Sequence, residues 1–193
     1  VALHHIFMNM NISSPAFSLK GKKGLILGVA NDHSIAWGCA QLASQQGAEV
    51  VATCLNDKAR RFVEPLTGPA GIKLVTCDVE QAGELEATVQ AAVQHMGRID
   101  FVMHSIAWAP LADLHGQVID SSSTGFARAM EVSCHSFATL AKLCAPHMPQ
   151  GGSMITMTYL GADEAVPHYG LMGPVKAALE SLVRYVALEL GPQ

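Results

Sequence analysis

The sequence lacks several features that would assign the chain to a particular class of proteins. It has 12 basic and 16 acidic residues, so its formal net charge is −4 and it offers no basic stripe for nucleic acid. The longest uninterrupted apolar run, around residues 25–30, is too short to span a bilayer. The N-terminal stretch "VALHHIFMNMNISSPAF" lacks the positive start and continuous apolar centre of a signal peptide. These absences argue against nucleic-acid and membrane partners and favour the cytoplasm.

Cysteine and histidine patterns typical of disulfides or metal sites are also missing. The five cysteines form no C-x-x-C pair and lie in apolar periodic segments. We therefore expect buried free thiols in a reducing compartment. The nine histidines are scattered and show no H-x-x-x-H spacing, so no metal site is predicted.

The sequence does contain a regular alternation of short apolar runs with longer segments of helical period. Strands are predicted at residues 23–30, 49–54, 72–77, 99–105 and 153–159; helices are predicted at 34–47, 57–66, 84–96 and 126–144 and in a last segment ending near 190, and a long loop at 106–123. Aliphatic strands without polar alternation are expected where both faces of a sheet are covered. The alternation therefore predicts an α/β fold with a doubly wound parallel sheet of Rossmann type.

The chain length is sufficient for one domain with a sizeable core. We expect residues 1–18 to be a flexible leader and residues 19–193 to form a single Rossmann domain. In such sheets ligands bind outside the carboxyl ends of the strands, near the point where strand order reverses. The segments to inspect follow Leu27, Cys54, Cys77, His104 and Thr158.

The turn after the first predicted strand, "GVANDHSIAWG" (28–38), is a candidate phosphate site. A tight turn into a helix leaves backbone N–H groups free for a pyrophosphate, and Gly28 permits close approach of the backbone to a ligand. The segment is not G-x-G-x-x-G, because its two glycines are ten positions apart and Ser34 lies between them. A purely structural turn is the alternative.

Two further strand ends carry candidate residues. Asp78 either accepts a hydrogen bond from an adenine amino group or caps the next helix. The segment "HSIAWAP" (104–110) offers small residues and backbone groups that suit a flat ring. His104 lies inside an apolar strand, so we interpret it as a core histidine rather than a base.

Residues 157–176 contain two of the three tyrosines. Tyr159 ends the fifth predicted strand, and Tyr169 precedes Lys176 by seven positions. On one continuous helix that spacing is about 700°, within about 20° of a single face, with a rise of about 10.5 Å. Pro174 predicts that the regular helix begins or bends near 173–174, which loosens this estimate. The pattern favours a lysine on a cofactor ribose and a tyrosine at the substrate; amphipathic packing is the alternative.

Taken together, "GVANDHSIAWG", "CDV" (77–79), "HSIAWAP", "TYLGADEAVPHY" (158–169) and the Tyr-x6-Lys spacing closely resemble the enoyl-acyl-carrier-protein reductases. These form a divergent branch of the short-chain dehydrogenase/reductase superfamily. The resemblance runs from about residue 20 to residue 192. Alcohol-acting members of the superfamily carry Tyr-x3-Lys, whereas Gly173 stands four residues after Tyr169 here.

The resemblance implies NADH-dependent reduction of the trans-2 double bond of an enoyl thioester on acyl carrier protein, in fatty-acid elongation. NADPH remains an alternative cofactor, since Lys58, Arg60 and Arg61 follow the second strand and could meet a 2′-phosphate. Two other functions stay open: a short-chain reductase acting on a carbonyl or imine, and a non-catalytic dinucleotide-binding relative.

The same resemblance implies residue roles. Tyr169 would stabilise the enolate formed from the thioester, Tyr159 would be the second active-site tyrosine, and Lys176 would bind the nicotinamide ribose. The implied cofactor-binding residues are Gly28, Ser34, Ile35, Asp78, Val79, Ser105, Ile106 and Lys176, and the implied substrate residues are Ala109, Tyr159 and Tyr169.

The resemblance also concerns size and assembly. The family continues past the position of Gln193 through two more strands and a substrate-covering loop. We therefore expect the 193 residues to be part of the working protein, with a sheet truncated at its fifth strand and an exposed edge there. Apolar stripes on the helix at 126–144 and on the last helix are first of all core, but they also allow a homo-oligomer, a tetramer by resemblance.

Overall fold

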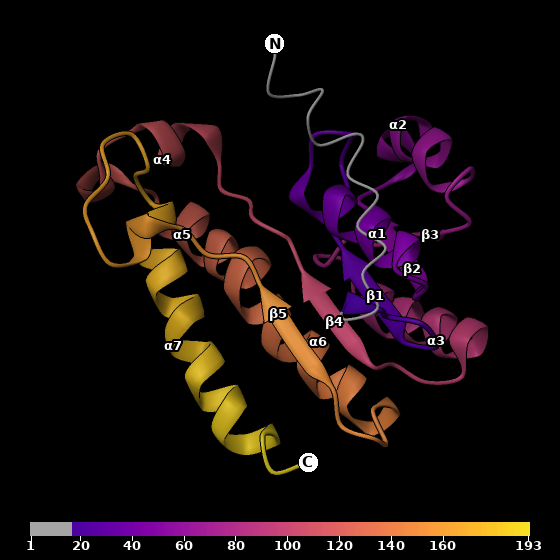
Figure 1. Cartoon of the computed structure of the whole chain (residues 1–193). Coiled ribbons are helices and arrows are strands. Elements are labelled where there is room, and N and C mark those ends of the chain that lie inside the picture. Colours follow the sequence, from indigo (N-terminus) through magenta and orange to yellow (C-terminus); the bar gives the residue numbers. More distant parts are fainter. Residues whose placement is uncertain (1–16) are drawn as a thin grey trace.

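The computed structural model describes residues 17–193, which form a five-stranded parallel sheet in the order β3-β2-β1-β4-β5 (Figure 1). The strands are β1 (Lys23–Leu27), β2 (Glu49–Cys54), β3 (Lys73–Thr76), β4 (Phe101–His104) and β5 (Ser153–Thr156). The longer helices are α1 (Ile35–Gln45), α2 (Asp57–Thr67), α3 (Glu84–Met96), α4 (Leu111–His115), α5 (Ser123–Met130), α6 (Ser136–Cys144) and α7 (Met172–Leu190). Short 3-10 turns are η3 (Val118–Asp120), η5 (Ala145–His147) and η6 (Leu160–Ala162), and η4 (Glu131–His135) is a π-helical turn. The α/β fold is confirmed; the predicted leader, residues 1–18, lies outside the described residues apart from its last two and stays a prediction.

Each face of the sheet has its own apolar core, because successive strand residues point to opposite faces. Ile26 of β1 belongs to the cluster beneath α1 and α2. Its neighbours Leu25 and Leu27 belong to the cluster beneath α3 and α6. Strands with apolar residues on both faces, covered by helices that each bury one face, therefore produce the doubly covered sheet.

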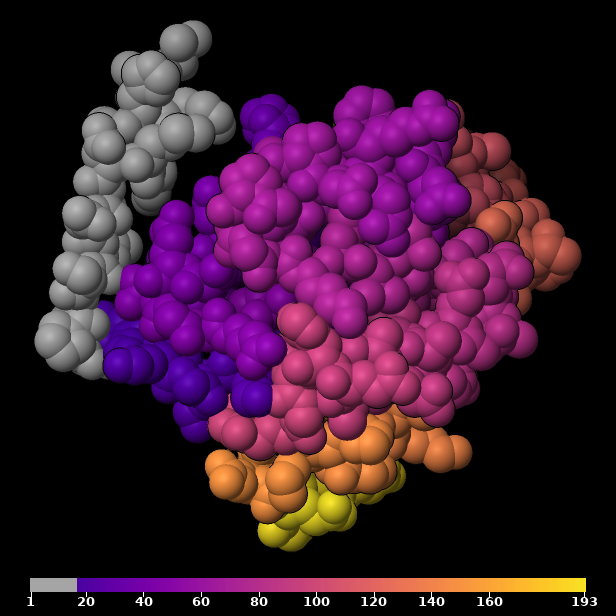
Figure 2. Space-filling model, turned by 90° about the vertical axis from the view of Figure 1, so that its right-hand side faces the viewer, coloured from indigo at the N-terminus to yellow at the C-terminus, as the bar shows by residue number. Residues whose placement is uncertain are grey.

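The last helix, α7, packs beside the sheet through a third apolar cluster that includes Phe137, Leu171, Val175 and Leu179. Figure 1 shows α7 running alongside β5. In Figure 2 the C-terminal segment, coloured orange and yellow, forms one end of the molecule. The predicted helix start near Pro174 is confirmed, since α7 begins at Met172 and Pro174 lies in its first turn.

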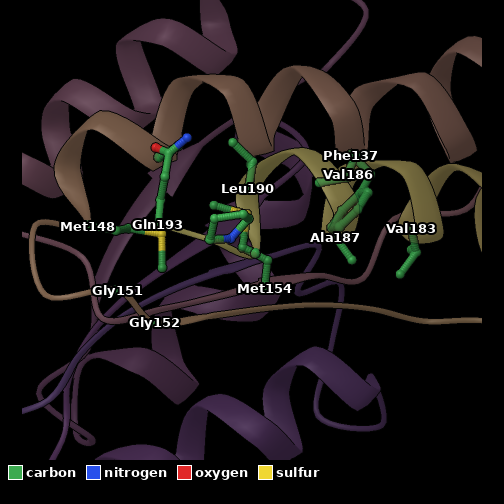
Figure 3. A pocket seen from close by; sticks show the side chains of 13 residues that line it. Phe137, Met148, Gly151, Gly152, Met154, Val183, Val186, Ala187, Leu190 and Gln193 are labelled. Carbon is green, nitrogen blue, oxygen red and sulfur yellow. The ribbon is translucent and has the colours of Figure 1, made fainter.

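Strand β5 is an edge of the described sheet, because it pairs with β4 alone. A cavity of about 540 Å³ lies against the amino-terminal end of this strand and the last turns of α7 (Figure 3). Its lining includes Phe137, Met154, Val186 and Leu190. The expected exposed edge is therefore present, and it is bordered by an apolar hollow.

Two predicted strand ends, one predicted loop and one predicted continuous helix differ from the structure. β1 ends at Leu27 instead of residue 30, and β5 ends at Thr156 instead of residue 159. The reason is register: Leu27 pairs with His104, and His104 pairs with Thr156, so the strands stop at one level. The predicted loop at 106–123 contains α4 and η3, and the predicted helix at 126–144 is interrupted by the π turn η4.

Gly28 lets the chain leave β1 within contact of the next strand end. Its φ of 95° lies in the left-handed region, and a Cβ there would lie 2.1 Å from the Ser105 carbonyl oxygen. Its N–H donates to Thr53 Oγ1 at 3.2 Å, and Ser105 N–H donates to Leu27 O at 3.2 Å. A side chain at position 28 would therefore push the ends of β1 and β4 apart.

The close approach at Gly28 predicts that two glycine substitutions lower the free energy of unfolding by different amounts. Gly71 has a φ of 67°, but a Cβ there would have no neighbour within 4 Å, so Gly71→Ala tests the backbone conformation alone. We expect Gly71→Ala to lower the unfolding free energy by about 1 kcal/mol. We expect Gly28→Ala to lower it by roughly 1–3 kcal/mol more, because backbone must move. Urea unfolding of both variants checks this; equal losses would contradict the close-contact explanation.

Candidate active site

The two tyrosines of the segment 157–176 meet at the carboxyl end of the sheet. The ring centroids of Tyr159 and Tyr169 are 4.6 Å apart, with an interplanar angle of 48°. Tyr159 lies three residues beyond β5 and is half exposed, and Tyr169 lies in the turn before α7. The structure therefore brings together two phenols that reach the same place from different turns.

Two glycines and a strained residue place the Tyr169 ring. A Cβ on Gly161 would lie 2.3 Å from Tyr169 Cδ1, so the ring packs directly on the Gly161 backbone. His168 has a φ of 64°, which is unusual for a residue with a side chain. Gly170 has a φ of 48° and lies against the Leu114 carbonyl of α4. Nothing in the sequence spacing identified Gly161 or α4 as the support of this tyrosine.

Tyr169 is protonated at neutral pH, as an ordinary phenol is, and its environment favours that form further. Burial raises the pKa of its phenol, and the neighbouring Tyr159 raises it further. A protonated phenol can donate a hydrogen bond to an oxygen that gains negative charge. The pair is thus suited to hold an oxyanion.

Lys176 is a buried cation at the same end of the sheet. Its side chain is 4% exposed, and its Nζ donates to the Met157 carbonyl at 2.7 Å. Burial lowers the pKa of the ammonium group. Across residues 17–193, no carboxylate forms an ion pair with it, and the Met157 carbonyl is its one hydrogen-bond acceptor. An ammonium group has three donors, so two remain for a ligand.

The relation between Tyr169 and Lys176 differs from the estimate for one helix. Tyr169 precedes the first residue of α7, Met172, so the two side chains do not project from a continuous helix. They are linked through the chain after β5, since Lys176 is held by the carbonyl two residues before Tyr159. The first turn of α7 also rests on this segment, where a Cβ on Gly173 would lie 3.0 Å from Gly161 O.

The turn between β1 and α1 carries the residues expected at a pyrophosphate. Ser34 is the N-cap of α1, but its hydroxyl donates to Asn31 O at 2.6 Å and makes no cap hydrogen bond. The first turn of α1 has no acidic residue, and Ile35 is exposed. The Trp37 N–H donates to Ser34 O at 3.0 Å. The N–H groups before it at the start of a helix have no intrahelical partner, so this end of α1 suits an anion.

Asp78 does not cap α3, so that alternative is wrong. The N-cap of α3 is Gly83 with a φ of 86°, five residues further on. Asp78 Oδ1 accepts the Glu80 N–H at 3.0 Å, and the Asp78 N–H donates to Glu84 Oε2 at 2.6 Å. Within the described chain Asp78 Oδ2 accepts no hydrogen bond, and Val79 beside it is half-buried.

The loop after β4 is held from several sides. Ser105 lies against Gly28, Ile106 is half-buried, and Ala109 packs on the cluster beneath α7. The Ser133 hydroxyl accepts the Trp108 N–H at 2.8 Å and donates to the Trp108 carbonyl at 2.9 Å.

Arg128 of α5 connects this loop to the loop after β3. Its guanidinium lies 4.0 Å from the centroid of the Trp108 ring and forms a two-pronged ion pair with Glu80, with Nη2 2.7 Å from Oε2. Sequence reasoning missed both Arg128 and Ser133, because an arginine and a serine on a helix carry no motif.

His104 is a core histidine, as predicted. It is fully buried, its Nδ1 lies 3.0 Å from Thr156 Oγ1, and its Nε2 lies 2.8 Å from Ser136 Oγ. Burial lowers the pKa of its ring to about 4, with a smaller contribution from the Lys176 charge. The ring is therefore neutral at physiological pH.

Four further features concern other kinds of site: the cysteines, possible metal ligands, possible membrane spans and the apolar cavity. All five cysteines are free, and four of them are buried. No group of three or more His, Cys, Asp or Glu side chains in the described part of the chain could hold a metal ion. None of the helices between residues 17 and 193 has both the length and the apolar character to cross a bilayer. The cavity of Figure 3 lies at the opposite end of β5 from Tyr159.

Comparison with known proteins identifies the family. The family profile described as enoyl-(acyl carrier protein) reductase matches residues 28–193. The chain belongs to the enoyl-(acyl carrier protein) reductase family. The Rhizobium meliloti (strain 1021) protein named enoyl-[acyl-carrier-protein] reductase [NADH] 1 is 42% identical over 174 residues, which are 90% of this chain and 64% of that protein. The Synechocystis sp. (strain ATCC 27184 / PCC 6803 / Kazusa) reductase FabI is 41% identical over 91% of this chain and 69% of its own length.

A solved structure gives the same result for the fold. The enoyl-(acyl-carrier-protein) reductase of Anaplasma phagocytophilum, crystallised in complex with NAD, superposes with a TM-score of 0.86 at 42% identity. The superposition covers 90% of this chain and 66% of that one. The chain thus has the fold of its family and spans about two thirds of the length of these reductases.

The buried histidine predicts a pH dependence of stability. Because folding lowers the pKa of His104 from 6.5 to about 4, the unfolded chain binds the proton more tightly. The stability that comes from keeping the ring neutral is fully present above pH 6.5 and is lost as the pH falls towards 4. The free energy of unfolding should therefore fall by about 3 kcal/mol over this range. Urea unfolding of wild type and His104→Gln across this range checks it. We expect the variant to lose less stability on acidification; parallel curves would contradict the shift.

Proposed function

We propose that this chain forms the cofactor-binding and catalytic part of an NADH-dependent enoyl-acyl-carrier-protein reductase. The proposed reaction is the reduction of the trans-2 double bond of an enoyl thioester on acyl carrier protein, in fatty-acid elongation. The observation that carries the proposal is the buried Lys176 ammonium, held by the Met157 carbonyl two residues before Tyr159, whose ring contacts Tyr169. Family membership and the NADH-dependent names of the relatives support it.

The residues at the carboxyl ends of the strands fit a dinucleotide. Gly28 keeps the first turn free of a side chain, and the start of α1 at Ile35, which no side chain caps, would offer backbone N–H groups to the pyrophosphate. The Ser34 N–H donates to Asn31 O at 3.2 Å, so Ser34 would have to turn towards the phosphate to contribute. Asp78 Oδ2 accepts no hydrogen bond from residues 17–193 and would accept one from the adenine amino group. Val79 would line the adenine pocket, and Ser105 with Ile106 would flank the ring end of the cofactor.

Lys176 would bind the nicotinamide ribose. Its Nζ uses one donor on Met157 O, which leaves two for the vicinal hydroxyls of a ribose. The cost of burying this charge without a carboxylate is offset when those donors are used. This assignment explains why a lysine stands at a position that is 4% exposed.

The tyrosines would act on the thioester. NADH, when bound, supplies a hydride to the carbon β to the thioester carbonyl. Negative charge then develops on the carbonyl oxygen, and the protonated Tyr169 phenol donates a hydrogen bond to it; such a donor contributes about 3 kcal/mol. Tyr159, in ring contact with Tyr169, would fix its orientation and offer a second hydroxyl, and the Ala109 backbone would lie on the substrate side.

The names of the relatives favour NADH over NADPH, and the basic residues after β2 have a structural role in α2. Arg60 Nε lies 3.7 Å from Asp57 and its Nη1 lies 3.7 Å from Glu64, so its charge is engaged within α2. The Asn56 side chain accepts the Ala59 N–H and caps α2. Lys58 and Arg61 are exposed at this helix, as in a solvated charged face.

Assembly and location belong to the same proposal. The family name implies acyl carrier protein as the partner that presents the substrate. We further propose a homotetramer in the cytoplasm, on the resemblance to the family; sedimentation analysis of the full protein tests the assembly.

Substitutions separate catalysis from cofactor binding. We expect Tyr169→Phe to lower the turnover of a crotonyl thioester about 100-fold and to leave the NADH dissociation constant within about twofold of wild type. The loss of the hydroxyl removes the donor to the oxyanion and leaves Lys176 in place. Tyr185→Phe, on an exposed tyrosine of α7, is the matched control and should retain activity.

The lysine variant gives the reverse pattern. We expect Lys176→Met to raise the NADH dissociation constant about tenfold or more, because the ribose loses a charged donor. Lys142→Met, at an exposed lysine of α6, is its control. NADH titration and a parallel assay with an acetoacetyl thioester complete the test. Unchanged NADH affinity in Lys176→Met would refute the ribose assignment, and preferred reduction of the acetoacetyl thioester would refute the proposed reaction.

A further inference from the structure

A buried polar network lies directly beneath the candidate active site. His104 at the end of β4 bridges Thr156 at the end of β5 and Ser136 at the start of α6. The histidine is 0% exposed and Ser136 is 4% exposed. Polar groups in such surroundings are costly unless every one finds a partner. The network therefore fixes three elements relative to one another.

The Ser136 side chain, directly after the π turn η4, fixes the direction of the hydrogen bonds. In an α-helix the Ser136 N–H would bond to the carbonyl four residues back, but here it bonds to Glu131 O, five residues back. The Ser136 hydroxyl instead donates to Val132 O at 2.7 Å. A hydroxyl has one proton, so Ser136 Oγ must accept at its contact with His104 Nε2.

The proton assignment then follows through the imidazole ring. Nε2 carries the hydrogen and donates to Ser136 Oγ, so Nδ1 of the neutral ring is an acceptor. The Thr156 hydroxyl donates to Nδ1 at 3.0 Å. The chain of donors thus runs from Thr156 to His104, Ser136 and finally Val132 O.

Two members of this chain, Thr156 and His104, directly precede residues of the candidate site in the sequence. Thr156 precedes Met157, whose carbonyl holds Lys176 Nζ, and His104 precedes Ser105 in the loop after β4. The same π turn contributes Ser133, whose hydroxyl binds both the N–H and the carbonyl of Trp108 in that loop. The Met157 carbonyl that holds Lys176 and the loop after β4 are therefore both attached to this buried network and the π turn beside it.

We propose that His104, Thr156 and Ser136 are positioning residues that set the orientation of the Met157 carbonyl and, through it, the place of the Lys176 ammonium. The functional consequence rests on the proposed NADH site, because Lys176 acts there on the cofactor. An apolar side chain at position 104 would fill the space against Phe137, whose ring packs edge-on at 5.7 Å, but would leave Thr156 and Ser136 without their partner.

A matched pair of substitutions at Thr156 tests the proposal on the full-length protein. Thr156→Val keeps the shape of the side chain and removes the donor to His104, whereas Thr156→Ser keeps the hydroxyl and removes a methyl group. We expect Thr156→Val to raise the NADH dissociation constant about fivefold, in line with the loss of one hydrogen bond. We expect Thr156→Ser, which keeps that hydrogen bond, to bind NADH within about twofold of wild type. Urea unfolding of both variants establishes that they are folded under the assay conditions.

Two spectroscopic readouts do not depend on the cofactor. Nitrogen NMR of the wild-type protein should show His104 protonated at Nε2 and unprotonated at Nδ1. The Lys176 side-chain resonance should shift in Thr156→Val and not in Thr156→Ser. An Nδ1-protonated ring, equal NADH affinities in the two variants or an unmoved Lys176 resonance would overturn the proposal. Should the wild-type protein bind no NADH, the proposed function fails, and the two NMR readouts still decide the positioning role.

Discussion

The hydrogen bond from Lys176 Nζ to the Met157 carbonyl is the constraint on which the candidate site depends. It takes an ammonium group from the second turn of α7 and fixes it at the carboxyl end of β5, two residues before Tyr159. The charge is buried and has no carboxylate partner within residues 17–193. Asp100 at the other end of the sheet is equally buried but is paired with Arg98 at 3.1 Å. A buried ammonium group that uses only one of its three donors is expected where a ligand supplies further acceptors. It is not expected where the charge only stabilises the fold.

Packing around this point leaves few alternatives for the backbone. Gly28 brings the ends of β1 and β4 into contact, and Gly161 lets the Tyr169 ring rest on the backbone after β5. The buried His104 joins β4 to β5 from below. The carboxyl ends of three neighbouring strands are thus fixed by small residues and one neutral imidazole. Catalytic groups on short turns need such support, because loops are otherwise the least constrained part of the fold.

Hydrophobic period and strand–helix alternation were sufficient to predict the parallel sheet, the order of its strands and helices along the chain, and the end of the sheet at which Tyr159, Tyr169 and Lys176 lie. They also identified Tyr159, Tyr169 and Lys176 as one group. Residues that act through distant contacts were missed: Arg128 and Ser133 carry no local pattern, and their roles appear once α5 and η4 lie against the loop after β4. Strand ends were overestimated because register with the neighbouring strand, and not apolar character, decides where pairing stops. The Tyr169–Lys176 relation could not be read from helical spacing, since Tyr169 precedes α7.

The most direct test of the central claim is a crystal structure of the full-length protein with NADH. We expect Lys176 Nζ to retain its contact with Met157 O and to lie within about 3 Å of the nicotinamide ribose hydroxyl oxygens, with the nicotinamide ring next to Tyr169. A nicotinamide bound elsewhere, or a Lys176 ammonium without contact to the cofactor, would contradict it.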